Sequence, residues 1–251
     1  MNKFFLATLS VFLLLSSCCN KPNNQTADSQ CGSNVGLSCE HVITKAFLTA
    51  EAQAKLTPDI VLEELKVGNK EFMQEIPTFL NTSQRMKASV SGQYPKAVIV
   101  SCLDSRVPVE DIFHCGIGDL FVARVAGNFI NEDILGSLEY ACKVSGSKLI
   151  VVLGHESCGA VKSAIDDVKL GNITAMLSKI KPAITNASEG FTGEKTSKNK
   201  EFVEKVCTHN ITYAIDQIRT NSPILKEMDD KGEIKIVGGI YLLENGEVVF
   251  L

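Results

Sequence analysis

Residues 97–106 read Ala-Val-Ile-Val-Ser-Cys-Leu-Asp-Ser-Arg, an apolar and β-branched run that passes directly into a polar loop. Residues 149–159, Leu-Ile-Val-Val-Leu-Gly-His-Glu-Ser-Cys-Gly, repeat this arrangement further along the chain. Each apolar run is typical of a buried strand. In open parallel sheets, ligand-binding and catalytic groups gather at the carboxyl ends of the strands. The two polar loops are therefore predicted to meet at one edge of a parallel sheet.

The two loops supply a set of side chains that suits zinc, namely Cys102, His155 and Cys158. Thiolate sulfur and neutral imidazole nitrogen are ligands that Zn²⁺ prefers. Three protein ligands leave a fourth position open, which is the arrangement of a catalytic rather than a structural zinc. Either motif alone has a plainer explanation, because buried cysteines are often ordinary core residues. Both motifs together, each after a strand, predict one zinc ion per chain.

The first loop also carries Asp104 and Arg106, which are two residues apart and can form an ion pair. Such a pair would keep the carboxylate ionised and oriented. An oriented Asp104 can accept a hydrogen bond from a nucleophile at the metal and aim it at an electrophile. Alternatively, Asp104 can swing onto the metal, fill the fourth position and close the site.

The remaining pattern predicts an α/β fold with a mainly parallel four-stranded sheet, an antiparallel edge strand, and helices on both faces. The Asn-Gly pair at residues 245–246 is a hairpin signal that leads into the edge strand. The expected strands are 97–102, 119–124, 149–153, 234–241 and 248–250, and the expected helices are 59–74, 131–144, 157–169 and 201–220. Residues 185–200 are polar and are expected to form a loop or a helix extension.

The beginning of the chain predicts export. Residues 1–17 read as a signal peptide that ends in Leu-Ser-Ser before Cys18, a pattern similar to the lipobox of bacterial lipoproteins, in which the cysteine is lipidated. Ordinary signal cleavage is the alternative. Residues 18–41 are polar and read as a flexible tether, and residues 42–251 as the folded domain. The expected location is the periplasm or the outer membrane of a bacterium, with a lipid anchor as the only membrane contact.

Composition narrows the function further. The formal net charge is −4 and basic blocks are lacking, so a nucleic-acid partner is not expected. Cys31 and Cys39 can form a disulfide after export or stay as thiols, and the sequence leaves both open. Cys115, Cys142 and Cys207 are expected to be buried, inert thiols, although a disulfide among them is also open.

From about Ala54 to Leu251, the sequence resembles the β-class carbonic anhydrases. The matching runs are 102–108 (Cys-Leu-Asp-Ser-Arg-Val-Pro), 118–122 (Gly-Asp-Leu-Phe-Val) with Arg124, and 154–159 (Gly-His-Glu-Ser-Cys-Gly). The resemblance implies zinc ligands at Cys102, His155 and Cys158, and a catalytic dyad at Asp104 and Arg106. The implied reaction is the reversible hydration of CO₂ to bicarbonate and a proton, with zinc-bound hydroxide as nucleophile.

The resemblance also implies a substrate pocket that contains Gln93, Phe121, Tyr140 and Gly159. In the family the glutamine and the tyrosine come from the partner subunit, which implies a homodimer, or a homotetramer built from it, with shared active sites. Some members inhibit themselves by binding bicarbonate in a pocket that uses a tryptophan. This chain has no tryptophan, so an open, plant-type site is expected.

The sequence departs from the family pattern at several positions. Leu103 stands where serine is common, Ala160 where a second glycine is common, and residues 124–128 differ modestly from the usual run. These departures leave rate and substrate range open. Two other functions stay open as well. One is hydrolysis of carbonyl sulfide or carbon disulfide on the same scaffold. The other is a non-catalytic zinc-binding envelope protein, against which the Asp104–Arg106 pair argues.

Overall fold

The structure, a computed structural model, describes residues 46–76 and 81–251. Its centre is a five-stranded sheet in the order β2-β1-β3-β4-β5. The first four strands in chain order pair in parallel, and β5 pairs antiparallel with β4. The strands are β1 Ala97–Ser101, β2 Leu120–Arg124, β3 Leu149–His155, β4 Lys235–Tyr241 and β5 Val248–Phe250. The predicted fold class is therefore confirmed.

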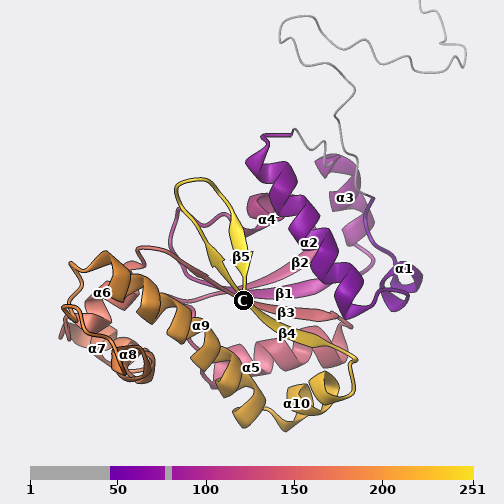
Figure 1. Ribbon diagram of the computed structural model, residues 1–251. Coiled ribbons are helices and arrows are strands. Elements are labelled where there is room, and N and C mark those ends of the chain that lie inside the picture. The colour runs from indigo at the N-terminus through magenta and orange to yellow at the C-terminus, as the bar shows by residue number, and fades with distance from the viewer. Residues whose placement is uncertain (1–45, 77–80) are drawn as a thin grey trace, which may run out of the picture. The chain divides into compact units, whose positions relative to one another are not determined.

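Helices cover both faces of this sheet (Figure 1). The helices of the described residues are α1 Ala50–Ala54, α2 Pro58–Met73, α3 Thr82–Ser89, α4 Val109–Ile112, α5 Glu132–Glu139, α6 Gly159–Ile165, α7 Gly171–Leu177, α8 Lys181–Ser188, α9 Lys200–Asn221 and α10 Pro223–Asp230. Of these, α6, α7 and α8 pack with one another and with α9 to one side of the sheet (Figure 1). A π-helical turn at Tyr140–Val144 continues α5. Helix α2 begins as its sequence predicts, because the Thr57 side chain accepts a hydrogen bond from the Ile60 amide and Pro58 occupies the first turn.

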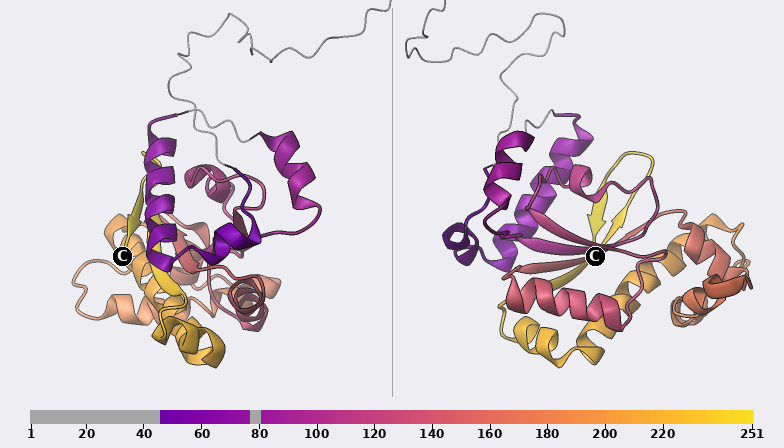
Figure 2. Two further views of the ribbon diagram at one scale, coloured as in Figure 1. Left: turned by 90° about the vertical axis from the view of Figure 1, so that its right-hand side faces the viewer. Right: turned by 180° about the vertical axis from the view of Figure 1, so that it is seen from behind.

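Alternate side chains of the central strands pack into two separate cores. Val98 and Val100 of β1 pack with Ile150 and Val152 of β3 against α5, α9 and α10. Ala97 and Ile99 face the other way, toward α2 and α4. The views in Figure 2 agree with this division of the helices between the two faces. A strand buried on both faces is apolar at every position, which is why the period-2 pattern is missing from residues 97–100.

Several predicted boundaries are wrong in detail. Strand β1 ends at Ser101, so Cys102 belongs to the loop. The helix expected at 157–169 is α6, which begins at Gly159, one residue after its N-cap Cys158, and ends at Ile165. Part of the 185–200 segment belongs to α8. Helices α1, α3, α4, α7 and α10 were not predicted, because helices of four to eight residues show too few turns for a clear 3.6-residue period.

The predictions for the beginning of the chain lie outside the described residues. They concern the signal peptide 1–17, lipidation of Cys18, the tether 18–41 with Cys31 and Cys39, and the domain start at Val42. Within the described ranges, no helix has the length and apolar character needed to cross a membrane. Cys142 and Cys207 are buried thiols that form no disulfide with another described residue, as predicted. Burial raises the pKa of each to about 12.

Candidate metal centre

Three predicted ligands meet at the carboxyl edge of the sheet. Cys102 follows β1, His155 is the last residue of the neighbouring β3, and Cys158 is the N-cap of α6. All three are buried, and their ligand atoms lie within 4.8 Å of one another. The Sγ atoms of Cys102 and Cys158 are 3.9 Å apart. Among the described residues, no other group of three or more histidine, cysteine or acidic side chains is placed to hold a metal ion.

The turn between His155 and Cys158 depends on an unusual backbone conformation. Ser157 has a φ of 52°, in the left-handed region that residues with a side chain adopt rarely. The turn lies between His155 and Cys158, whose ligand atoms come within 4.8 Å of each other. Gly154 lets α9 approach the end of β3, because a Cβ there would lie 2.7 Å from Cδ1 of Ile211. Bulk at Gly154 would therefore push β3, and with it His155, away from the other ligands.

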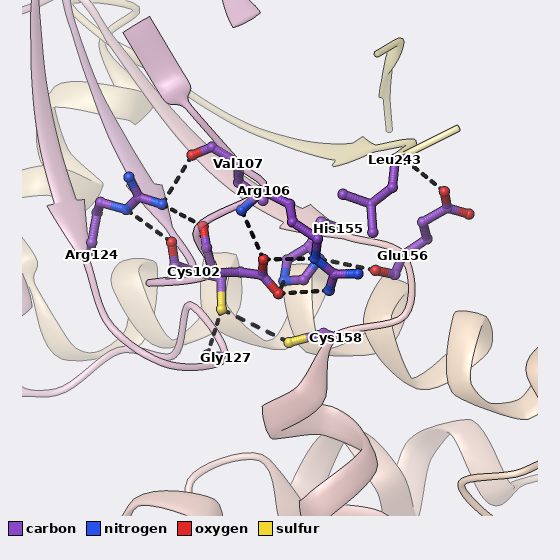
Figure 3. A network of polar contacts seen from close by, with 10 residues as sticks. Cys102, Arg106, Val107, Arg124, Gly127, His155, Glu156, Cys158 and Leu243 are labelled. Atoms are coloured by element: carbon purple, nitrogen blue, oxygen red, sulfur yellow. Dashed lines mark hydrogen bonds and ion pairs between the residues drawn. The ribbon is translucent and has the colours of Figure 1, made fainter. Parts of the chain in front are cut away.

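His155 is oriented for metal binding by its own neighbour. Its Nδ1 lies 2.9 Å from the carbonyl oxygen of Glu156, so Nδ1 carries the proton and Nε2 keeps its lone pair. Nε2 is buried and has no hydrogen-bond partner among the described residues. The Glu156 side chain is fixed in turn, because its Oε1 accepts a hydrogen bond of 2.6 Å from the amide of Leu243 (Figure 3). An outer contact of this kind sets the tautomer and ring orientation of a metal-binding histidine.

The two thiols share their protons unequally. The hydrogen bond from Cys158, the largest cause, lowers the pKa of Cys102, and the hydrogen bond from the Gly127 amide also favours this thiolate. The same Cys102 contact, followed by burial, raises the pKa of Cys158. Two thiolates 3.9 Å apart repel each other unless a cation lies between them. The two sulfur atoms are therefore stable close together when they share one proton or when they bind one metal ion.

Asp104 and Arg106 form the predicted pair at the rim of the centre. Arg106 donates from Nε to Oδ1 at 2.9 Å and from Nη2 to Oδ2 at 2.7 Å. This bidentate contact holds the pKa of Asp104 well below its usual range. Oδ2 of Asp104 lies 3.8 Å from Nε2 of His155, too far for a hydrogen bond. The carboxylate therefore stands next to the ligand cluster while being held by the guanidinium.

Arg124 is a residue whose role the sequence reasoning missed. It ends β2 and pairs in register with Ser101, the residue before the first ligand. Its guanidinium donates to three carbonyl oxygens of the polar loop, those of Cys102 at 3.0 Å, Asp104 at 2.7 Å and Val107 at 2.9 Å (Figure 3). A guanidinium has five N–H donors in a fixed plane, so a single arginine can hold several carbonyl oxygens of one loop in place. The sequence feature that could have indicated this role is the position of Arg124 at the end of a strand that neighbours β1.

The predicted pocket residues lie elsewhere in the single chain. Gln93 is exposed and precedes the amino end of β1, opposite to Cys102. Phe121 pairs in register with Val98, and its ring contacts Tyr140 edge-on with centroids 6.3 Å apart. These three residues are thus not brought to the metal ligands of their own chain. Gly159 does adjoin Cys158, but a Cβ there would meet no atom within 4 Å, so packing does not require a glycine.

The geometry fits zinc. Two closely spaced thiols and an unpartnered buried imidazole nitrogen supply three soft or borderline ligands, and the fourth direction is left to a small molecule. Calcium and magnesium require oxygen ligands and do not suit this set. Fold and site together define a metal-dependent enzyme of the α/β class, with its centre at the carboxyl edge of a parallel sheet.

Comparison with known proteins identifies the family. The family model for carbonic anhydrase matches residues 97–248. Carbonic anhydrase 2 of Mycobacterium tuberculosis is 34% identical over 198 residues, covering 76% of this chain and 92% of that protein. The carbonic anhydrase of Mycolicibacterium smegmatis is 35% identical over 197 residues, again covering 76% of this chain and 92% of that protein.

Solved structures agree. The β-carbonic anhydrase CcaA has a TM-score of 0.61 at 26% identity, covering 76% of this chain and 87% of that chain. A β-carbonic anhydrase of Sordaria macrospora, at 23% identity and a TM-score of 0.61, shares the fold and covers 77% of this chain and 94% of that chain. The chain belongs to the β-class carbonic anhydrase family. It is accordingly a lyase that hydrates CO₂ reversibly to bicarbonate.

Proposed function

We propose that this chain hydrates CO₂ at a zinc ion held by Cys102, His155 and Cys158, with Asp104 and Arg106 as the catalytic pair. The observation that carries the proposal is the buried, unpartnered Nε2 of His155 facing two thiols 3.9 Å apart. A buried polar atom without a partner is costly, so it indicates a ligand. The named relatives support this reaction, and none of those reported above supports a carbonyl sulfide hydrolase or a zinc-buffering protein.

The side chains divide the work. A zinc ion held by these ligands would supply the nucleophile by acidifying a water molecule. Asp104, kept ionised and fixed by Arg106, accepts the hydrogen bond that orients this nucleophile toward CO₂. Arg124 keeps the loop that carries both Cys102 and Asp104 in one conformation. The intact pair with Arg106 supports an open form of the site, because Asp104 would fill the fourth ligand position only if it left the guanidinium.

Stopped-flow measurement of CO₂ hydration, with zinc assayed on the same sample, tests this proposal. Fast hydration at about one zinc per chain is expected from the one three-ligand centre found among the described residues. Full zinc occupancy without hydration would contradict the proposed reaction, and a repeat with carbonyl sulfide would then test the altered substrate. A protein that retains no zinc would contradict the proposed metal.

Zinc binding should release about one proton per ion near neutral pH. The raised pKa of Cys158 and the lowered pKa of Cys102 mean that the metal-free pair holds a single proton in this range. Zinc affinity should therefore rise about tenfold per pH unit until Cys158 loses that proton. Titration of the metal-free protein with zinc in weak buffer, followed by a pH indicator, measures the release. Two protons per ion, at a pH low enough for a zinc-bound water to keep its proton, would mean that both thiols are protonated in the metal-free protein.

We further propose that the active sites are shared within a homodimer, or within a homotetramer built from it. Strand β2 forms one edge of the sheet, with β1 on its inner side. Beside it lies a groove of about 530 Å³ lined in part by Phe121, Gly136 and Tyr140, and Tyr140 is 51% exposed. An open edge with exposed aromatic side chains suits pairing with a second copy. Gln93, Phe121 and Tyr140 would then reach a substrate site completed by the partner's metal centre.

Mixing two inactive variants should restore activity if the sites are shared. One variant carries Cys102→Ser, and the other carries Gln93→Ala with Tyr140→Ala. A mixed dimer has one complete site, so random co-assembly should give about a quarter of wild-type activity. Co-expression with two affinity tags, followed by the CO₂ assay, measures this. Activity equal to the mean of the two parent proteins would show that each site lies within one chain.

We also propose that the protein is a bacterial envelope lipoprotein anchored through Cys18, in the periplasm or on the outer membrane. The support is the apolar run that ends in Leu-Ser-Ser before this cysteine. Cys18→Ala should move the protein from the membrane fraction to the soluble fraction, and Cys19→Ala should not. Fractionation of cells labelled with a palmitate analogue measures both location and lipidation. Equal membrane retention of the two variants would contradict the anchor.

A further inference from the structure

We propose that Asn210 is a positioning residue of the metal centre, acting through Gly127 on Cys102. Asn210 lies in α9, away from the motifs that supply the ligands. The proposal rests on the zinc centre proposed above. It adds a buried side chain that fixes the direction of the Gly127 amide, which donates to the sulfur of Cys102.

Asn210 places a polar amide on the buried face of α9, where most of the other residues are apolar. It belongs to the buried stripe of α9, between Val206 and Ala214, and is only 1% exposed. Its Nδ2 donates to the carbonyl oxygen of Gly127 at 2.8 Å. Its Oδ1 has no hydrogen-bond partner among the described residues, so the amide's polar contact is directed to Gly127. Burying an amide costs free energy unless it is hydrogen-bonded, and the bond to the Gly127 carbonyl offsets part of that cost here.

Gly127 is held in a conformation that other residues avoid. Its φ is +84°, and a Cβ would lie 2.6 Å from Cδ1 of Ile180 and 3.2 Å from Cβ of Ala160. In this conformation the Gly127 amide points at Cys102 and donates to its Sγ at 3.3 Å (Figure 3). The carbonyl of the same residue points to α9 and receives the Asn210 bond. Rotation of Gly127 would therefore break both contacts together.

The amide-to-sulfur bond acts on the metal through the ligand. It stabilises negative charge on Cys102 and withdraws electron density from the thiolate, as hydrogen bonds to ionised acceptors do. It also fixes the sulfur relative to Cys158 and His155. Loss of such an outer contact weakens metal binding by about 10- to 100-fold in metal sites generally. Without Asn210, Gly127 is free to rotate, and Cys102 loses a donor and part of its preorganisation.

The test compares Asn210→Ala and the isosteric Asn210→Asp with a matched control, Asn69→Ala. Asn69 is also a buried amide, at 4% exposure, that donates to two backbone carbonyl oxygens and accepts from the Val248 amide, but it ties α2 to the hairpin before β5. Removing it should weaken the fold without touching the metal ligands. Zn²⁺ affinity is measured by chelator competition, and Co²⁺-substituted protein reports the thiolate-to-metal charge-transfer absorption.

Both Asn210 variants should bind Zn²⁺ about 10- to 100-fold more weakly than wild type. Their cobalt charge-transfer band should move to longer wavelength, because a thiolate with fewer hydrogen bonds gives up electron density at lower energy. Asn69→Ala should keep the wild-type cobalt band and the wild-type Zn²⁺ affinity, although its Tm should fall about as much as that of the Asn210 variants. Unchanged affinity and spectrum in a folded Asn210 variant would overturn the inference, as would an equal change in Asn69→Ala. Wild-type protein that binds neither metal would instead overturn the proposed zinc centre.

Discussion

Cys102→Ser is expected to abolish zinc retention and CO₂ hydration together. Cys102 is 4% exposed and is the only ligand that reaches the centre from β1. A serine hydroxyl does not ionise near neutral pH and is a poor ligand for zinc beside a thiolate and an imidazole. The remaining His155 and Cys158 form a two-ligand site on a single turn. Zinc content should fall to less than about a tenth of an ion per chain, and hydration to the uncatalysed rate.

Cys142→Ser is the matched control for this change. Cys142 is equally buried but lies in the core against α9 and α10, away from the centre. The same loss of sulfur there should lower Tm and leave the zinc content at about one ion per chain. Elemental analysis, the hydration rate and circular dichroism on both variants separate metal loss from unfolding. A folded Cys102→Ser protein with full zinc would remove Cys102 from the ligand set.

Much of this fold is predictable because its strands are buried on both faces. Continuous apolar runs such as 149–153 can be recognised without knowledge of the tertiary structure, and the polar residues that follow them mark the functional edge. The ligand set was visible for the same reason, since each ligand lies within a few residues of a strand end. Short helices such as α4 and α7 were missed because their residues are fixed by tertiary packing rather than by an amphipathic period.

The outer contacts of the centre were harder to predict because they join segments far apart in sequence. His155 contacts the backbone carbonyl of Glu156, and every residue type has such a carbonyl, so the sequence gives no sign of this contact. Asn210 did leave a mark, as a lone amide in the apolar stripe of α9, but its partner at Gly127 depends on how α9 packs on the sheet. The contact proposed for Gln93 across a subunit interface came from the family resemblance alone, because nothing within one chain marks a contact of this kind.

Asp104→Asn is expected to keep zinc and lose most of the turnover. The substitution preserves shape but removes the negative charge and replaces one acceptor oxygen with a donor amide. That amide would face the Arg106 guanidinium, so the bidentate contact through Oδ1 and Oδ2 cannot persist. Because the three ligands are untouched, zinc content should stay at about one ion per chain. Loss of the orienting acceptor should lower kcat on the order of 100-fold, within the range for positioned proton acceptors.

Asp167→Asn provides the matched control for the loss of an ion-paired carboxylate. Asp167 contacts Lys169 and Lys181 at the surface, and the Lys169 hydrogen bond, followed by that of Lys181, lowers its pKa to about 2. The same change there should leave kcat and zinc content unaltered. If Asp104→Asn also loses zinc, the carboxylate stabilises the metal site instead of orienting the nucleophile. If kcat stays near wild type, Asp104 has no part in the reaction, and Arg106 would hold it only as a structural element of the loop.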